Sequence, residues 1–206
     1  MTDKLAFVGD VHGNLDALKG VLAALAERGN PHAVFLGDYI NRGEAPAAVL
    51  EELLSRRRRG EVTLLAGNHE QVLLSALDSG DLGPFLKMGG ATTIRSYLGR
   101  PVRPDVLVDF RAHLPSEHVD SLRSMPTLWD SDDIVAQHAP FKEPSSKFQV
   151  SAHVPVGLLP RITADSAQLD TGGGDTAGTG RLTALLWPSR DFIQVDARGM
   201  PVPGAR

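Results

Sequence analysis

The feature that most constrains this chain is the segment GDYINRG at residues 37–43, which follows the apolar run at residues 33–36. A short apolar run with a glycine after it predicts a buried β-strand that ends at the glycine. Such a strand delivers the carboxylate of Asp38 to the carboxyl edge of a sheet. Open α/β folds bind their ligands at that edge, so the segment predicts a site as well as a strand.

The same pattern occurs on both sides of this segment. Residues 5–8 lead into GDVHGN at residues 9–14, and residues 62–66 lead into GNHE at residues 67–70. Because the carboxyl ends of parallel strands meet at one edge of a sheet, we expect their polar side chains to gather there. The side chains concerned are Asp10, His12, Asp38, Asn68 and His69.

Helical patterns connect these strands. Apolar residues recur at helical spacing over residues 15–28, after Asn14 as a cap, and again over residues 46–59. The strands and helices then form right-handed βαβ units, which predicts an α/β fold. The second helix ends in four consecutive arginines at residues 56–59. These suit either a phosphate or nucleic-acid patch or a solvated helix end that complements the helix dipole, and we favour the latter.

The middle of the chain, residues 70–125, is predicted to be mostly helical. Its helical patterns are interrupted at Gly80, at residues 89–90 and again at Pro101 and Pro104. We expect a helical insertion that covers the site rather than an independent domain.

Strand patterns return in the second half of the chain. Strands are expected at residues 127–129, 133–137, 148–152, 168–170, 181–187 and 191–195. The second and third of these end at His138 and His153, so they add two imidazoles to the predicted site. Residues 199–206 are expected to form a flexible tail.

The composition narrows the functional classes. A length of 206 residues with 42% hydrophobic and 22% charged residues suits a single domain, residues 1–206. A net charge of −4 gives no basic field for nucleic acid or a membrane surface, and no apolar run is long enough to span a bilayer. Without cysteine, a metal must take oxygen and nitrogen ligands. No signal-peptide pattern follows Met1, so we expect a cytoplasmic protein.

Six polar residues at the predicted strand ends have side chains that bind divalent cations: Asp10, His12, Asp38, Asn68, His138 and His153. Any one of them alone is better explained as a turn or surface residue. Their repetition predicts two cations that share Asp38, because its strand is expected to lie between the other two. Two cations about 3.5–4 Å apart ionise a bridging water and hold a phosphoryl group for in-line attack. The pattern therefore predicts metal-assisted phosphoester hydrolysis.

The segments at residues 9–13, 37–43 and 67–70 resemble, in this order, the three signature motifs of the calcineurin-like metallophosphoesterases, and look most like the phosphoprotein phosphatase branch. The resemblance implies a four-layer α/β fold in which a central β-sandwich is flanked by helices. Four later segments are similar to bacterial serine/threonine protein phosphatases and symmetrical diadenosine-tetraphosphatases: residues 114–118, 138–139, 169–172 and 181–185.

The resemblance also implies roles for single residues. Arg42 is expected to bind the phosphate through its planar guanidinium, and His69 to protonate the leaving alcohol as a general acid. The metals are expected to be Mn²⁺, with iron or zinc as alternatives. The implied ligands are Asp10, His12 and Asp38 for the first metal ion, and Asp38, Asn68, His138 and His153 for the second.

Asn41 departs from the family pattern, which usually has aspartate here to orient and polarise the catalytic histidine. Asn41 is expected still to accept a hydrogen bond from His69, but it carries no charge to stabilise the imidazolium. Slower chemistry or a shifted pH optimum would follow.

Further departures lie around the later motifs. Ala66 stands where arginine is often found before the third motif, and the segment between His138 and His153 is short and lacks the usual second phosphate-binding arginine. The flanks of His153, in the sequence AHVP, are altered as well. The cations that could replace the missing arginine are Lys142, Lys147, Arg95 and Arg161.

The sequence leaves three functions open. The first is a phosphatase for phosphomonoesters, with phosphoserine or phosphothreonine in proteins as the expected substrate. The second is hydrolysis of dinucleoside polyphosphates or another small phosphoester, since the short segment before His153 would open the cleft to either. The third is a degenerate member that keeps the metals and acts as a binding module, which Asn41 and the missing arginine motivate. The expected partner is thus a phosphorylated protein or a small phosphoester.

Overall fold

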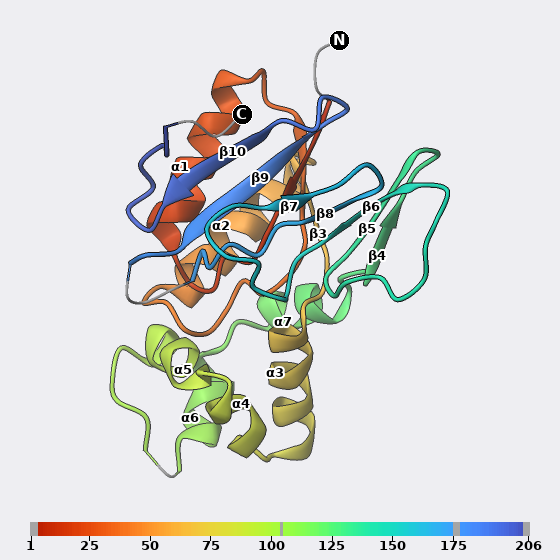
Figure 1. Cartoon of the computed structure of the whole chain (residues 1–206). Coiled ribbons are helices and arrows are strands. Elements are labelled where there is room, and N and C mark those ends of the chain that lie inside the picture. The colour runs from red at the N-terminus through yellow and green to blue at the C-terminus, as the bar shows by residue number, and fades with distance from the viewer. Residues whose placement is uncertain (1–3, 104, 175–177, 204–206) are drawn as a thin grey trace.

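The computed structural model describes residues 4–103, 105–174 and 178–203, which form two five-stranded sheets and a group of helices (Figure 1). Sheet A has the strand order β10-β9-β1-β2-β3. In it β1, β2 and β3 are parallel, whereas β9 and β10 are antiparallel to their neighbours. The strands are β1 Leu5–Val8, β2 His32–Phe35, β3 Val62–Leu64, β9 Arg181–Trp187 and β10 Phe192–Asp196.

Helices α1 (Leu15–Glu27) and α2 (Pro46–Arg58) connect the parallel strands, as the helical patterns predict. The Asn14 side chain caps α1 by accepting a hydrogen bond from the Ala17 amide at 3.0 Å. Three of the arginines at the end of α2 form ion pairs with glutamates, and the fourth, Arg57, donates to Ser121 and Ser124. Their pairing agrees with a helix end rather than a nucleic-acid patch.

Sheet B packs on the other face of sheet A and has the order β4-β5-β6-β8-β7. Large apolar side chains from both sheets, among them Phe7, Leu36, Phe148 and Leu185, fill the space between them. The predicted β-sandwich is therefore confirmed. The strands are β4 Leu128–Asp130, β5 Ile134–Gln137, β6 Phe148–Ser151, β7 Arg161–Ile162 and β8 Ser166–Gln168.

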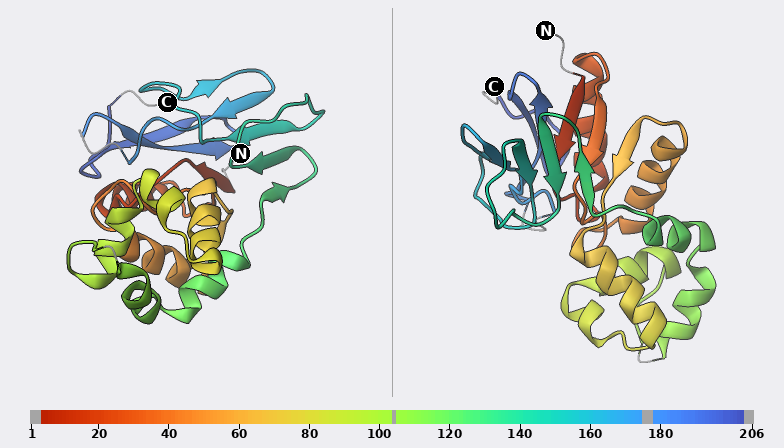
Figure 2. Two further views of the ribbon diagram at one scale, coloured as in Figure 1. Left: turned by 90° about the horizontal axis from the view of Figure 1, so that it is seen from below. Right: turned by 90° about the vertical axis from the view of Figure 1, so that its right-hand side faces the viewer.

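The helices lie on one side of the sandwich, against sheet A (Figure 2). Among the described residues, a loop connects β5 to β6, and the segment from β6 to β8 contains only loops and the short strand β7, so the outer layer of helices implied by a four-layer arrangement is not formed over sheet B. The pattern of the strands explains this difference. Gln149, Ser166 and Gln168 point away from the core and are half-buried, and a polar face of this kind needs no helix to cover it.

Helices α3 to α7 form a layer below the sheets (Figure 1). Their buried apolar side chains, including Leu73, Phe85 and Phe110, belong to the same core cluster as those of α1 and α2. The insertion therefore has no separate hydrophobic core. Its helices are α3 Asn68–Ser79, α4 Gly83–Lys87, α5 Gly90–Leu98, α6 Val106–His113 and α7 Ser116–Arg123.

The chain returns along β10 after its last strand. The Val202 amide donates to the Gln194 carbonyl at 2.9 Å, and Gly199 contacts α1 so closely that a Cβ on Gly20 would lie 2.2 Å from the Gly199 oxygen. The described part of the expected flexible tail is thus hydrogen-bonded and packed, while residues 204–206 lie outside the described residues. None of the helices in the described part of the chain has the length and apolar character to cross a bilayer.

Candidate dinuclear metal centre

The predicted strand ends converge at the lower edge of the two sheets. Asp10 and His12 follow β1, Asp38 follows β2, and Asn68 and His69 begin α3 just after β3. Because β2 lies between β1 and β3, the strand that carries Asp38 has the central position that the sequence predicts. The neighbouring strands β5 and β6 of sheet B bring His138 and His153 to the same place.

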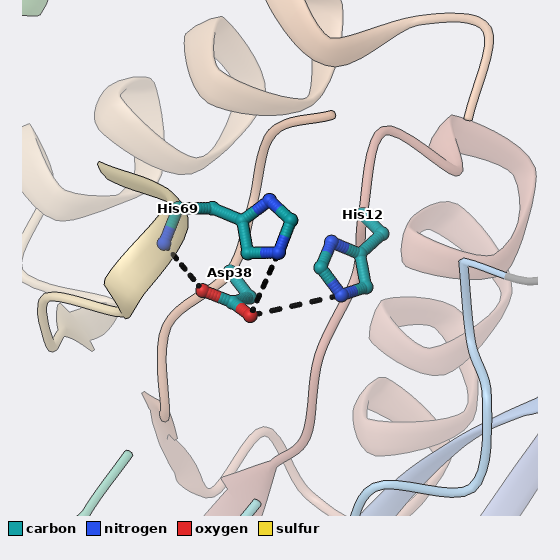
Figure 3. Close-up of side chains that lie close together, drawn as sticks. All are labelled: His12, Asp38 and His69. Atoms are coloured by element: carbon teal, nitrogen blue, oxygen red, sulfur yellow. Dashed lines mark hydrogen bonds and ion pairs between the residues drawn. The ribbon is translucent and has the colours of Figure 1, made fainter. Parts of the chain in front are cut away.

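Asp38 lies between His12 and His69, as Figure 3 shows. Its Oδ2 atom is 3.7 Å from the Nε2 atom of each imidazole, and its Oδ1 atom accepts a hydrogen bond from the His69 amide at 3.1 Å. The carboxylate is 2% exposed. Two imidazole nitrogens and a carboxylate oxygen therefore face one another, and all three side chains are buried.

One ring nitrogen of His12, Nε2, faces this group of side chains without a hydrogen-bond partner in the described part of the chain. The Nδ1 atom donates to the Ile40 carbonyl at 3.1 Å, which leaves Nε2 as the atom that faces Asp38 and Asp10. Nε2 is also buried. Buried polar atoms are nearly always paired. An imidazole fixed through Nδ1 with a free, buried Nε2 is the usual arrangement of a metal ligand.

A second group of ligand atoms lies on the other side of Asp38. The His138 Nε2 atom is 3.4 Å from Asp38 Oδ1, 2.8 Å from Asn68 Oδ1 and 3.1 Å from His153 Nδ1. His138 Nδ1 donates to the Leu36 carbonyl, so Nε2 is the coordinating atom in this ring as well. Ligand atoms of Asp38 thus belong to two groups, one with His12 and His69 and one with His138 and His153.

The buried carboxylates of this cluster require a compensating positive charge. Burial, together with the carboxylates of Asp38 and Asp170, raises the pKa of Asp10 well above its usual range. Burial lowers the pKa of His12 to about 3. In His138 burial opposes the charged ring, but the hydrogen bond and charge of Asp38 outweigh it and raise the pKa to about 9. Without a metal ion, protons must therefore supply the positive charge that these buried carboxylates require.

The backbone around the cluster is held in an uncommon conformation. His12, Asp38, Asn41, Arg42 and His153 all have positive φ, between 44° for His12 and 71° for Asn41. Non-glycine residues in this region cost about 1–3 kcal/mol each, and they cluster at functional sites. Two further non-glycine examples, at Asn30 and Arg190, lie elsewhere.

The donor set fits two divalent cations. Its atoms are carboxylate and amide oxygens and imidazole nitrogens, which suit manganese, zinc or iron, and the free Nε2 of His12 has no other evident use. Asp10 Oδ2 is 3.8 Å from His12 Nε2, which agrees with their implied place on one cation. His69 is as close to Asp38 as His12 is, so distance alone does not separate its implied role as an acid from that of a ligand.

The hydrogen bonds of Asn41 differ from the expected ones. Thr93 accepts from the Asn41 backbone amide at 2.9 Å, and its hydroxyl donates to Asn41 Oδ1 at 2.7 Å. This leaves the Asn41 Nδ2 group to donate to His69 Nδ1, at 2.7 Å. The expectation that Asn41 accepts from His69 is therefore wrong, because Thr93 already occupies the amide oxygen. His69 consequently carries its proton on Nε2. In an imidazolium, the additional Nδ1–H group would face the Nδ2–H donor of Asn41, so the charged ring is disfavoured.

Glu70 is a buried residue to which the sequence assigns no role. Its carboxylate accepts the backbone amides of Asp38 and Tyr39 at 2.9 Å and of Gly67 at 3.0 Å. It thereby joins the second motif to the third and fixes the backbone of Asp38. The signal for it is its place three residues after Gly67 at a helix start, which is the spacing of a capping box.

Replacing Glu70 with alanine is expected to lower the free energy of unfolding by about 3 kcal/mol or more, because three buried amides lose their acceptor at about 1–3 kcal/mol each. Urea unfolding of the metal-free protein, followed by circular dichroism, measures this change. The exposed Glu44→Ala variant is the control, and equal stabilities of the two variants would contradict the assigned role.

Asp170 is a second buried acid that the sequence does not single out. The predicted strand at residues 168–170 instead ends at Gln168, so Asp170 lies beyond β8, where its Oδ1 accepts the Gly172 amide at 3.0 Å. Burial raises its pKa, and its charge in turn raises that of Asp10. Asp170 thus adds to the negative charge around the cluster.

An open cavity of ≈ 460 Å³ leads from the surface to the cluster. Arg42, which makes no side-chain hydrogen bond in the described ranges, lines it together with Asp38, Asn68, His69 and His153. The four basic residues expected as replacements for the missing arginine do not line it, and Lys147 pairs with Asp130 at 2.7 Å instead. Lys87, at the end of α4, lies in its wall.

Several solved structures have a fold similar to that of this chain. The chain is similar to a protein assigned provisionally as a diadenosine tetraphosphatase (18% identity, 95% of this chain and 94% of that chain covered, TM-score 0.67). It is also similar to a mutant of a cold-active protein tyrosine phosphatase (17%, 98% and 80%, TM-score 0.60). A third similar structure is a protein serine/threonine phosphatase from Saccharomyces cerevisiae (12%, 95% and 79%, TM-score 0.54). At these identities the similarities establish the fold.

A search of curated proteins found no match to the chain. The sequence model of the calcineurin-like phosphoesterases, however, matches residues 4–177. This span contains all the strand ends described above, from Asp10 to His153, and it covers most of the chain. The chain therefore belongs to the calcineurin-like phosphoesterase family and is a dinuclear metal-dependent phosphoester hydrolase.

Proposed function

We propose that this protein hydrolyses phosphomonoesters, with phosphoserine or phosphothreonine in proteins as substrates. The observation that carries the hydrolytic chemistry is the position of Asp38, whose two oxygens face two separate groups of imidazoles. Two divalent cations bound there supply an ionised water and neutralise charge on the phosphate. Asp38 would hold both, Asp10 and His12 one, and Asn68, His138 and His153 the other.

Residues around the cations would bind the phosphate and protonate the leaving group. The exposed Arg42 offers a planar pair of donors to two phosphate oxygens at the mouth of the cavity. The Nε2–H group of His69 faces Asp38 and the cavity, and the protonated ring would deliver this proton to the leaving oxygen and become a neutral imidazole. Asn41 sets this tautomer and disfavours the imidazolium, which predicts slow hydrolysis of alkyl phosphates.

The rim of the cavity supports a protein substrate. Arg42, Lys87 and His153 line it and are exposed, so a phosphorylated side chain on a protein surface can reach the cluster without a lid opening. Manganese is proposed as the metal because the carboxylates of Asp10 and Asp38 and the amide of Asn68 offer the oxygen ligands that suit it.

The proposal is tested by removing metals with chelator, reloading the protein with Mn²⁺ and measuring turnover of p-nitrophenyl phosphate, a phosphoserine peptide and diadenosine tetraphosphate in parallel. We expect metal-dependent turnover of the first two. Turnover confined to diadenosine tetraphosphate would reassign the substrate. Metal binding without turnover of any of the three would contradict the proposal and favour a binding module.

A further inference from the structure

Two cationic side chains line the cavity over the metal cluster, Arg42 and Lys87. Both residues are exposed, and in the described part of the chain neither side chain forms a hydrogen bond or an ion pair. Many other cations of this surface are paired, among them Arg56, Arg58 and Lys147. Two unpaired cations are thus available to a ligand at the mouth of the site.

The turn that follows Lys87 packs directly against Arg42. Gly89 has a φ of +83°, and a Cβ built on it would lie 3.4 Å from the Arg42 backbone nitrogen and 3.6 Å from its Cγ atom. The next residue, Gly90, packs against the Phe85 ring of α4, where a Cβ would come within 2.5 Å. Gly89 is therefore in van der Waals contact with Arg42, and Gly90 leaves no room for a larger residue beside Phe85, so the end of α4 lies close to Arg42.

Hydrogen bonds fix this packing one helical turn further on. Thr93 of α5 binds both the amide and the side chain of Asn41, the residue before Arg42. Since Asn41 also contacts His69, the insertion and the phosphate-binding segment have a defined relative position. Lys87 consequently belongs to the same wall of the cavity as Arg42 and does not depend on a mobile loop.

The charge of the substrate explains why two cations are useful. A phosphomonoester approaches with nearly two negative charges, and it must come close to the carboxylates of Asp10, Asp38 and Asp170. Arg42 can bind two oxygens with its planar fork, whereas Lys87 is a compact charge on a flexible stem that can reach a third. A phosphodiester carries only one charge and one fewer free oxygen.

We infer that Lys87 binds a terminal oxygen of the substrate phosphate together with Arg42 and makes the site selective for phosphomonoesters over phosphodiesters. The inference rests on the proposed phosphatase function and takes it further. Lys87 supplies, from the helical insertion, the second phosphate-binding cation that is missing between His138 and His153.

Calorimetric titration of the Mn²⁺-loaded protein with inorganic phosphate tests the inference without requiring turnover. The Lys87→Met variant keeps the length of the side chain and removes its charge, and we expect its Kd for phosphate to rise about tenfold. The Lys87→Arg variant should stay within about threefold of the wild type, because the charge remains. The Lys19→Met variant, at an exposed lysine of α1, is the matched control and should leave the Kd unchanged.

Selectivity is measured with p-nitrophenyl phosphate and bis(p-nitrophenyl) phosphate. The ratio of their kcat/KM values should fall about tenfold in Lys87→Met, mainly through a higher KM for the monoester. The inference would be overturned by a phosphate Kd that is unchanged in Lys87→Met or by a wild type that binds no phosphate. A loss of bound Mn²⁺ in Lys87→Met would overturn it as well. Phosphate binding that depends on Lys87 in a wild type without turnover would instead refute the proposed function and retain the binding role.

Discussion

Replacing Asn41 with aspartate is expected to raise kcat on a phosphoserine peptide by about tenfold or more at neutral pH. General acid catalysis contributes roughly 10²–10⁴-fold to such reactions, and the wild type keeps little of it because His69 is held neutral. Burial lowers the pKa of His69, and the Asn41 amide donates to its Nδ1 atom. A carboxylate at position 41 would instead accept a hydrogen bond from the Nδ1–H group and stabilise the imidazolium by its charge.

The same substitution should shift the pH dependence of kcat to higher pH. A negative charge beside the ring raises the pKa of His69, so the protonated acid persists to higher pH and the basic limb of the kcat profile should move up by about one unit or more. The gain should be small on p-nitrophenyl phosphate, whose leaving group needs no proton. Leaving-group dependence therefore separates acid catalysis from a general change in metal affinity.

Two variants control the experiment. Asn30→Asp places the same new charge at an exposed asparagine that also has positive φ but lies outside the cluster, and it should change neither rate nor profile. Adding His69→Ala to Asn41→Asp should remove the gain, since the aspartate acts through that ring. An Asn41→Asp protein with the wild-type rate on phosphoserine and the wild-type pH profile would show that His69 is not the acid.

Replacing Asp38 with asparagine is expected to have the largest effect of any single change. The amide has nearly the same shape and keeps an oxygen for the His69 amide, so the fold should survive. It loses the charge that both groups of imidazoles share. Because the two cations supply several kcal/mol of transition-state stabilisation, kcat should fall about 10³-fold or more.

Metal content and kcat measure the Asp38→Asn prediction together. Bound Mn²⁺ after desalting should fall from two ions per chain to one or fewer, whereas Asp16→Asn, at an exposed aspartate of α1, should retain both ions and full activity. An Asp38→Asn protein that keeps two ions per chain and most of its activity would rule out a bridging role.

Much of the site could be predicted from the sequence because it is built from local signals. An apolar run followed by Gly-Asp identifies a strand end, and the helix that follows makes the next strand parallel and adjacent. Asp10, Asp38 and Asn68 therefore had to meet at one edge. His138 and His153 follow the same pattern in the second sheet, where each comes after a strand.

Other features depend on contacts that no local pattern reveals. The orientation of the Asn41 amide is decided by Thr93, 52 residues further along the chain. Lys87 acquires its place only when the turn at Gly89 packs on Arg42. The family resemblance implies helices over sheet B, but the described segments between its strands contain no helix. The polar residues Gln149 and Gln168 are the signal in the sequence that this face is solvated.

Electron paramagnetic resonance of the chelator-treated protein, reloaded with two equivalents of Mn²⁺, shows whether two cations share Asp38. Two ions bridged by one carboxylate at about 3.5–4 Å are magnetically coupled, so we expect a multiline spectrum of a coupled pair that disappears in Asp38→Asn. The six-line spectrum of isolated Mn²⁺ at full loading would contradict a shared dinuclear centre.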